Sequence, residues 1–385
     1  MRQTLRFVRW CPAEQEGDVN ETSDAKTPLD AETRAPLVVP ETLTRDEISS
    51  YDALRNDAAW FESVGTWSSI RGPKAAEALN GLVTNDAMAL KPGEGQYAAA
   101  LSPKGKIVAD MLVIREDAET FLLSVLRAAS DSWLALARKY VNPRLAKVAD
   151  ETERYATWMI YGARAPHAVA ALGGAGATAE NLRDVMASAL VEWPVWHHGP
   201  WNLGPASVRL VRAPLMGSLP GFIIIADAAN AAIVQARLRA SPSKRATQDV
   251  WNVARVEGGR PAFGVDMDEN TLPQEANLDT LGAISFEKGC YTGQETVARI
   301  HFRGHVNKNL RALFGSAPLP QGAAVFDESG KVVGDVRSSV VSPRLGPIAI
   351  AMLRREVADG QQVVVANDLG EISARVSTLP FPSGE

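Results

Sequence analysis

Apolar and polar residues alternate along most of this chain in short runs that predict strands. Residues 96–101 and 107–114 are two such runs, and the Ser-Pro-Lys-Gly turn at 102–105 between them predicts an antiparallel hairpin. Residues 131–141 repeat apolar side chains at helical spacing, which predicts an amphipathic helix. The same mixture recurs over residues 155–172 and 208–240. We therefore predict an α+β fold with antiparallel sheets, because neither a Gly-x-Gly-x-x-Gly nor a P-loop sequence is present.

The pattern changes beyond Gly304. Short alternating runs separated by turn residues predict six strands, at residues 310–314, 324–326, 332–340, 348–353, 362–365 and 372–376. Strands this short and this regularly spaced favour a small closed sheet. We predict that residues 305–385 form a separate C-terminal β-barrel.

Residues 1–45 are rich in acidic residues, Thr, Ala and Pro and are predicted to be a disordered extension, with order beginning near Tyr51. Residues 11–50 hold ten acidic and three basic side chains, and the first ten residues add three arginines. The total charge of −5 therefore leaves the rest of the chain near −1. A nearly neutral body argues against general affinity for nucleic acid.

The chain shows no sign of export or of a membrane span. Its longest apolar candidate is the four-residue run 222–225, and the basic start is followed by acidic residues that do not suit a transit peptide. The two cysteines, Cys11 and Cys290, are far apart, and no Cys-x-x-Cys exists. This indicates a reducing, cytoplasmic location and no autonomous iron–sulfur or zinc site of the protein's own.

The most informative stretch is residues 288–295, Lys-Gly-Cys-Tyr-Thr-Gly-Gln-Glu. Thr292 and Glu295 have the spacing of a capping box, which predicts a helix from Gly293 to about residue 304. Cys290 would then lie just before the positive end of a helix dipole, with Lys288 two residues away. Both features favour a thiolate, so Cys290 and Lys288 are the candidate catalytic residues. The alternative is a capped surface helix that follows an inert, buried cysteine.

These eight residues, with 296–299 and 302–304, resemble the signature of the folate-binding YgfZ family, a relative of the aminomethyltransferase (T-protein) of glycine cleavage. Further landmarks occur in the family's order, at residues 80–86, 102–106, 255–259 and 272–278. The resemblance implies a three-domain GcvT-like cloverleaf, in which residues 46–304 form the folate-binding region. It also implies tetrahydrofolate binding and a role in supporting iron–sulfur client enzymes or their assembly factors, including those that thiolate tRNA.

The resemblance also suggests which residues hold the folate. It assigns Arg255 to a ligand carboxylate, with Glu257 in the same Arg-x-Glu-Gly context, and Asp110 to the strand that carries the transferase's two adjacent aspartates. Here Ala109 fills one of those two positions, and no acid occurs at residues 216–222, where the transferase has a glutamate. Trp67 is a candidate for stacking on the pterin, or else a core tryptophan.

Two other functions remain open. One is aminomethyl transfer in glycine cleavage, against which the two missing acids count. The other is a cysteine-nucleophile enzyme whose base would be His301 or His305.

Two further clusters lack a settled role. The basic stretch at 299–311, with its arginines, lysine and histidines, is either a solvated face or a docking site for polyglutamate, tRNA phosphate or an acidic partner. The tryptophans around His197 and His198 predict an interdomain hairpin rather than a metal site.

Overall fold

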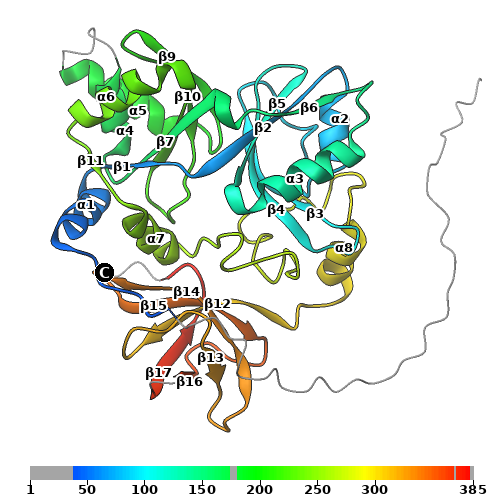
Figure 1. Cartoon of the computed structure of the whole chain (residues 1–385), viewed down its shortest axis with the longest axis vertical. Coiled ribbons are helices and arrows are strands. Elements are labelled where there is room, and N and C mark those ends of the chain that lie inside the picture. The colour runs from blue at the N-terminus through cyan, green and yellow to red at the C-terminus, as the bar shows by residue number, and fades with distance from the viewer. Residues whose placement is uncertain (1–37, 174–179, 368–369, 382–385) are drawn as a thin grey trace, which may run out of the picture. The chain divides into compact units, whose positions relative to one another are not determined.

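The computed structural model describes residues 38–173, 180–367 and 370–381 (Figure 1). The chain divides into two units, Met1–Pro36 and Leu37–Glu385, and the architecture below is that of the second. Most of the predicted disordered extension therefore lies outside the described residues. Its last part is ordered: Val38 and Thr42 form isolated bridges with Gln321 and Val341.

The first helix begins earlier than the expected start of order at Tyr51. Helix α1 spans Arg45–Asn56. Thr44 caps it with a complete capping box, since its hydroxyl accepts from the Glu47 amide and the Glu47 carboxylate accepts from the Thr44 amide. The capping signal at residues 44–47 marks the boundary better than the apolar pattern does.

A five-stranded antiparallel sheet, in the order β3-β4-β5-β2-β6, forms the first α+β layer. The predicted hairpin is confirmed, because β3 and β4 pair around the turn at residues 102–105. Helix α3 packs on this sheet and buries Trp133, whose indole N–H donates to Ser68 on β2. The bounds are β2 Gly65–Arg71, α2 Ala75–Asn80, β3 Gly95–Leu101, β4 Ile107–Arg115, β5 Thr120–Leu126, α3 Arg127–Tyr140 and β6 Lys147–Asp150.

A six-stranded sheet, in the order β11-β1-β7-β10-β9-β8, forms the second layer. Its pairs are antiparallel except for the short parallel pair β1–β11. Residues of its strands and of α4, α5 and α6 share one apolar cluster. The bounds are β1 Ala59–Glu62, β7 Tyr155–Tyr161, α4 Ala165–Leu172, α5 Glu180–Glu192, β8 His198–Leu203, β9 Ala206–Arg212, β10 Gly221–Asp227, α6 Ala231–Ala240 and β11 Lys244–Arg245.

The C-terminal strands close into an antiparallel barrel in the order β12-β15-β14-β13-β16-β17, as the alternating pattern predicts. Helices α7 (Gln248–Glu257) and α8 (Gln294–Arg303) precede the barrel along the chain. The barrel strands are β12 Lys308–Gly315, β13 Ala324–Phe326, β14 Val332–Ser342, β15 Gly346–Arg354, β16 Gln362–Asn367 and β17 Gly370–Ser377.

The predicted α+β class, the antiparallel sheets and the C-terminal barrel are thus confirmed. No helix in the described part of the chain is long and apolar enough to cross a membrane.

Candidate functional site

A cavity of about 370 Å³ lies where the two sheets meet helix α7. Its wall includes residues of β2, β4 and β5 from the five-stranded sheet, β7 and β10 from the six-stranded sheet, and α7 itself. This volume is in the usual range for pockets that bury a small ligand. We call it the aromatic cavity, because five aromatic side chains line it: Trp67, Tyr97, Trp196, Trp251 and Phe263.

The aromatic rings come from segments far apart in the sequence. Tyr97 on β3 stacks with Trp196, with ring centres 6.5 Å apart and planes 27° apart. Trp196 has a left-handed backbone conformation, with φ of 65°. The tryptophan-rich segment does form the predicted hairpin link between the two sheets, since the His198 amide donates to the Gly93 carbonyl. The position of Trp196 in the cavity wall was not predicted.

A partly buried carboxylate is the main polar feature of the aromatic cavity. The Asp110 carboxylate accepts a hydrogen bond of 2.8 Å from the Tyr97 hydroxyl through Oδ2. Its other oxygen, Oδ1, is buried without a hydrogen-bond partner among the described residues. Burial raises the pKa of Asp110, although the Tyr97 hydrogen bond and the nearby Arg260 act in the opposite direction. An unsatisfied buried oxygen in a cavity wall is suited to accept from a ligand N–H.

Arg260 supplies positive charge to the same wall. Its guanidinium lies over the Tyr97 ring, 3.8 Å from the ring centre, and it forms no ion pair within the described residues. Arg127, at the start of α3, also lines the cavity and is exposed. Neither arginine was predicted, because neither stands in a recognisable motif.

Arg255 lines the cavity, but protein groups already engage most of its guanidinium. Nη1 donates to the buried Asp266 carboxylate at 2.9 Å and to the Arg260 carbonyl at 3.1 Å. Nη2 donates to the Ser338 hydroxyl on barrel strand β14 at 2.8 Å. The side chain expected to hold a ligand carboxylate therefore ties α7 to the barrel.

Glu257 does not reach the aromatic cavity. Its carboxylate accepts from the hydroxyls of Tyr51 on α1, at 2.6 Å, and Ser342 on β14, at 2.5 Å. Arg55 and Arg344 each lie 3.7 Å from its other oxygen. This residue, expected to contact folate, instead joins helix α1, helix α7 and the barrel.

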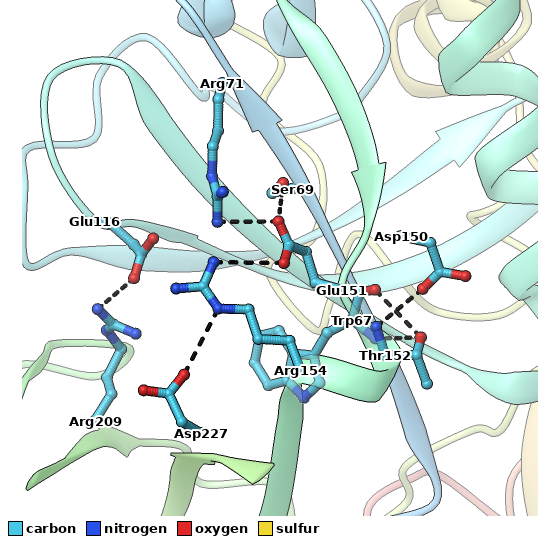
Figure 2. Close-up of polar contacts among 10 residues, drawn as sticks. All are labelled: Trp67, Ser69, Arg71, Glu116, Asp150, Glu151, Thr152, Arg154, Arg209 and Asp227. Atoms are coloured by element: carbon cyan, nitrogen blue, oxygen red, sulfur yellow. Dashed lines mark hydrogen bonds and ion pairs between the residues drawn. The ribbon is translucent and has the colours of Figure 1, made fainter. Parts of the chain in front are cut away.

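Trp67 does line the cavity, in a position fixed by a polar network (Figure 2). Its indole N–H donates to Thr157 on β7 at 2.8 Å, and its main chain bonds with the turn at Glu151 and Thr152. The buried Glu151 carboxylate in turn accepts from Ser69 and pairs with two arginines, Arg71 and Arg154. These contacts connect β2, the turn at residues 151–152 and β7 around the Trp67 side chain.

The Cys290 loop, residues 285–293, is a second region outside the aromatic cavity. Lys288 lies within it, and the Lys288 ammonium donates to three carbonyls, those of Asn80 at 2.7 Å, Val83 at 2.6 Å and Asn85 at 2.9 Å. An ammonium has three N–H groups, so this contact set uses all of them. Burial lowers the pKa of Lys288 to about 8. The lysine expected to stabilise the Cys290 thiolate is instead directed at the turn after α2.

The predicted capping box at Thr292 is wrong. Gly293 is the N-cap of α8 in a left-handed conformation, with φ of 80°, and makes no side-chain cap. The Thr292 hydroxyl donates to the Gly81 carbonyl at 3.4 Å. Gln294 reaches back instead, and its side-chain oxygen accepts from the Tyr291 amide at 3.1 Å. The helix itself starts and ends where predicted.

Two of the sequence landmarks, residues 80–86 and 102–106, pack against this loop and the start of α8. The turn at residues 102–105 packs so closely that a Cβ on Gly105 would lie 2.7 Å from Thr296, and one on Gly293 would lie 2.5 Å from the Ser102 carbonyl. Asn85 donates to the carbonyls of Gly282 and Tyr97, which links the loop to a cavity strand. Amid these contacts the Cys290 thiol is exposed.

The histidines proposed as bases for Cys290 have other surroundings. His301 on α8 stacks on Phe286, with ring centres 3.6 Å apart. His305 lies beyond the last helical residue, Arg303, so the two histidines do not lie on one face of α8. No hydrogen bond joins either of them to Cys290 among the described residues, and the His–Cys hypothesis gains no support.

The comparisons with known proteins agree with this architecture. Residues 36–288 match the family of the GCVT N-terminal domain, and residues 309–382 match the glycine cleavage T-protein C-terminal barrel domain. The chain is 29% identical to the tRNA-modifying protein YgfZ of Escherichia coli O157:H7 (strain EC4115 / EHEC), over 78% of this chain and 83% of the relative. The same values hold for the YgfZ protein of Escherichia fergusonii.

A solved structure shows the same fold. The glycine cleavage system aminomethyltransferase T from Bartonella henselae superposes with a TM-score of 0.76, at 21% identity, over 89% of this chain and 91% of its own. The resemblance to the YgfZ family and the GcvT-like fold inferred from the sequence are thereby confirmed.

Proposed function

We propose, from the premise that this chain belongs to the GCVT N-terminal domain family, that its aromatic cavity binds tetrahydrofolate or a related folate. The observation that carries the proposal is the Oδ1 atom of Asp110, which has no hydrogen-bond partner in the described part of the chain and lies in a cavity lined by aromatic side chains. A pterin offers flat ring faces and ring N–H donors, and the cavity provides rings to stack on and a buried acceptor for an N–H. Tetrahydrofolate, when bound, would supply a carrier for one-carbon units.

The charged groups of the wall match the rest of a folate. Arg260 and the exposed Arg127 are available for the carboxylates of the glutamate tail, whereas Arg255 is largely used within the protein. Asp110 would orient the pterin and Trp67 would form one wall. Glu257 and Lys288 would act through the fold and not through contact with the ligand.

The wider role follows the relatives named tRNA-modifying protein YgfZ. We propose that this folate-binding protein supports tRNA modification and the iron–sulfur enzymes on which it depends, with Cys290 as the reactive group of its loop. The exposed thiol on a closely packed loop supports this assignment. A cytoplasmic location remains a prediction from the sequence.

Tetrahydrofolate titration with tryptophan fluorescence tests the binding proposal, because Trp67, Trp196 and Trp251 all line the cavity. We expect saturable quenching in the wild type, and affinity lowered about tenfold or more in Arg260→Ala, which loses a charged hydrogen-bond donor. Arg239→Gln, an exposed arginine on α6, is the control and should bind normally. Absence of saturable binding in the wild type would refute the proposal.

Complementation of cells that lack the protein tests the wider role. The full-length chain should restore iron–sulfur enzyme activity and thiolated tRNA, and Cys290→Ala should fail while accumulating to normal levels. A form that starts at residue 38 should succeed, because every sequence landmark and every residue named for the site lies beyond that position. Full activity of Cys290→Ala would show that the loop's role is structural.

Aminomethyl transfer is the second candidate, and the carboxylate of Asp110 in the cavity wall is what favours it. Turnover of an aminomethyl-loaded lipoyl carrier protein, lost in Asp110→Asn, would establish that activity. We expect no such turnover, because Ala109 stands in place of a second aspartate.

A further inference from the structure

Helix α8 carries an exposed basic and aromatic face that the folate proposal does not use. Only Val297 of this helix is buried. Phe302 is 68% exposed, the highest value of any large apolar side chain in the described ranges. Apart from it, Tyr140 is the only other aromatic among the exposed large hydrophobics there, at 44%. An exposed phenyl ring lowers the solubility of a protein, and exposed apolar side chains of this size are typical of surfaces that contact a partner.

Arginines flank this ring. Arg299 and Arg303 lie one helical turn apart and are exposed, and within the described residues neither forms an ion pair. A surface hollow beside Phe302 is lined by both arginines, by Thr296 and Ala298, and by one acid, Glu295. The charge of the hollow is therefore positive, and the guanidiniums are free to meet an anion.

A second element extends the positive charge. The turn between β3 and β4 packs against α8, where the Thr296 hydroxyl donates to the Lys104 carbonyl at 3.4 Å (Figure 1). Lys104 is exposed and also forms no ion pair in the described part of the chain. We call Lys104, Arg299, Phe302 and Arg303 the α8 patch. It adjoins the Cys290 loop, because α8 begins four residues after that cysteine.

We propose that the α8 patch binds single-stranded RNA, with the base of one nucleotide stacked on Phe302 and phosphates held by Arg299, Arg303 and Lys104. This inference rests on the proposed function and deepens it, by making RNA a direct partner. Bases supply π faces and phosphates supply negative charge, which together match a ring between guanidiniums. An acidic peptide would match the charges alone and leave the ring without a partner.

The near-neutral charge of the body does not contradict a local site. It indicates weak affinity for duplexes in general, since non-specific duplex binding depends on many phosphate contacts. The α8 patch offers three cations and one stacking ring, which suits a short single-stranded segment such as a loop or a free end. The expectation from the sequence that nucleic acid is not bound strongly is therefore kept for duplexes, and the α8 patch is proposed as an exception for single strands.

Fluorescence anisotropy with a short fluorescein-labelled single-stranded RNA, on the full chain, tests the proposal. Phe302→Ala should weaken binding about 5- to 150-fold, the usual effect of removing the ring under one stacked base. The double variant Arg299→Gln, Arg303→Gln should reduce the slope of log affinity against log salt by about 0.7 for each phosphate that it no longer neutralises. Two substitutions of exposed residues outside the patch serve as controls, Tyr140→Ala for loss of an aromatic ring and Arg239→Gln for loss of a positive charge. Both variants should bind the RNA normally.

Four results would overturn the proposal. The wild type could fail to bind the RNA, the patch variants could bind as well as the wild type, or duplex RNA could compete as well as single strands. Polyglutamate that displaces the RNA, with no effect of Phe302→Ala, would assign the face to an acidic protein and also overturn it. Tetrahydrofolate titration of every variant keeps the two proposals apart, because normal folate binding without RNA binding refutes only this one.

Discussion

The aromatic cavity and the Cys290 loop differ in two respects: how specific their sequence motifs are, and how many of their polar groups are available to bind a ligand. The loop has the most specific motif in the chain, yet most of its residues hold the backbone together: Lys288 binds three carbonyls and Gly293 permits close packing. The cavity has a weak sequence signal, yet it presents an unpartnered carboxylate oxygen and an arginine without an ion pair among the described residues. A specific sequence motif therefore does not by itself identify a catalytic or binding site, because tight local packing can require the same residues.

The largest expected effect concerns Arg255, which lines the aromatic cavity and also ties α7 to the barrel. Arg255→Ala should lower the free energy of unfolding by about 3–5 kcal/mol, because it leaves Asp266 buried and unpaired. Urea denaturation measures this decrease. Stability near that of the wild type with folate binding abolished would instead make Arg255 a direct ligand contact.

The next test separates structure from reactivity inside the loop. Lys288→Met should destabilise the protein by about 3 kcal/mol, because three partly buried carbonyls lose a charged donor. Cys290→Ala changes an exposed side chain and should alter stability by less than about 0.5 kcal/mol. If urea denaturation showed equal losses of stability for the two substitutions, the idea that Lys288 supports the structure while Cys290 does not would be wrong.

A smaller effect of opposite sign is expected in the cavity. The raised pKa of Asp110 means that folding disfavours its ionised form, so its contribution to stability is greatest below its unfolded pKa and is lost as pH rises through the folded value. Asp110→Asn should therefore stabilise the protein at neutral pH, while weakening tetrahydrofolate binding. Thermal unfolding across pH checks the sign, and the gain should disappear in acid.

The last test changes no stability and measures the rate at which the Cys290 thiol is alkylated. Cys290 should react quickly with iodoacetamide in the folded protein, because its thiol is exposed. The measurement uses a Cys11→Ser background, so that only one thiol reports. Reaction only after unfolding would contradict the exposed position and weaken the case for a reactive group.

The fold was predictable because hydrophobic periodicity and turn residues are local. The hairpin of β3 and β4 and the six barrel strands follow directly from them. The site was only partly predictable: Trp67, Asp110 and Arg255 reach the aromatic cavity, whereas Glu257 and Lys288 do not. Arg260 and Trp196 enter it through tertiary packing, which no spacing in the sequence records.

The ties made by Arg255 and Glu257 bear on how this protein can be divided. Arg255 bonds to Ser338 and Glu257 to Ser342, both on barrel strand β14, and the main apolar cluster includes barrel residues such as Leu310 and Ile350. A cut between residues 304 and 305 would therefore strip partners from two buried charged groups and expose part of that cluster. The barrel is matched by its own family model, over residues 309–382, but it cannot be removed without breaking these contacts. Exchange of barrels between relatives should therefore succeed only when the residues that contact α7 are exchanged as well.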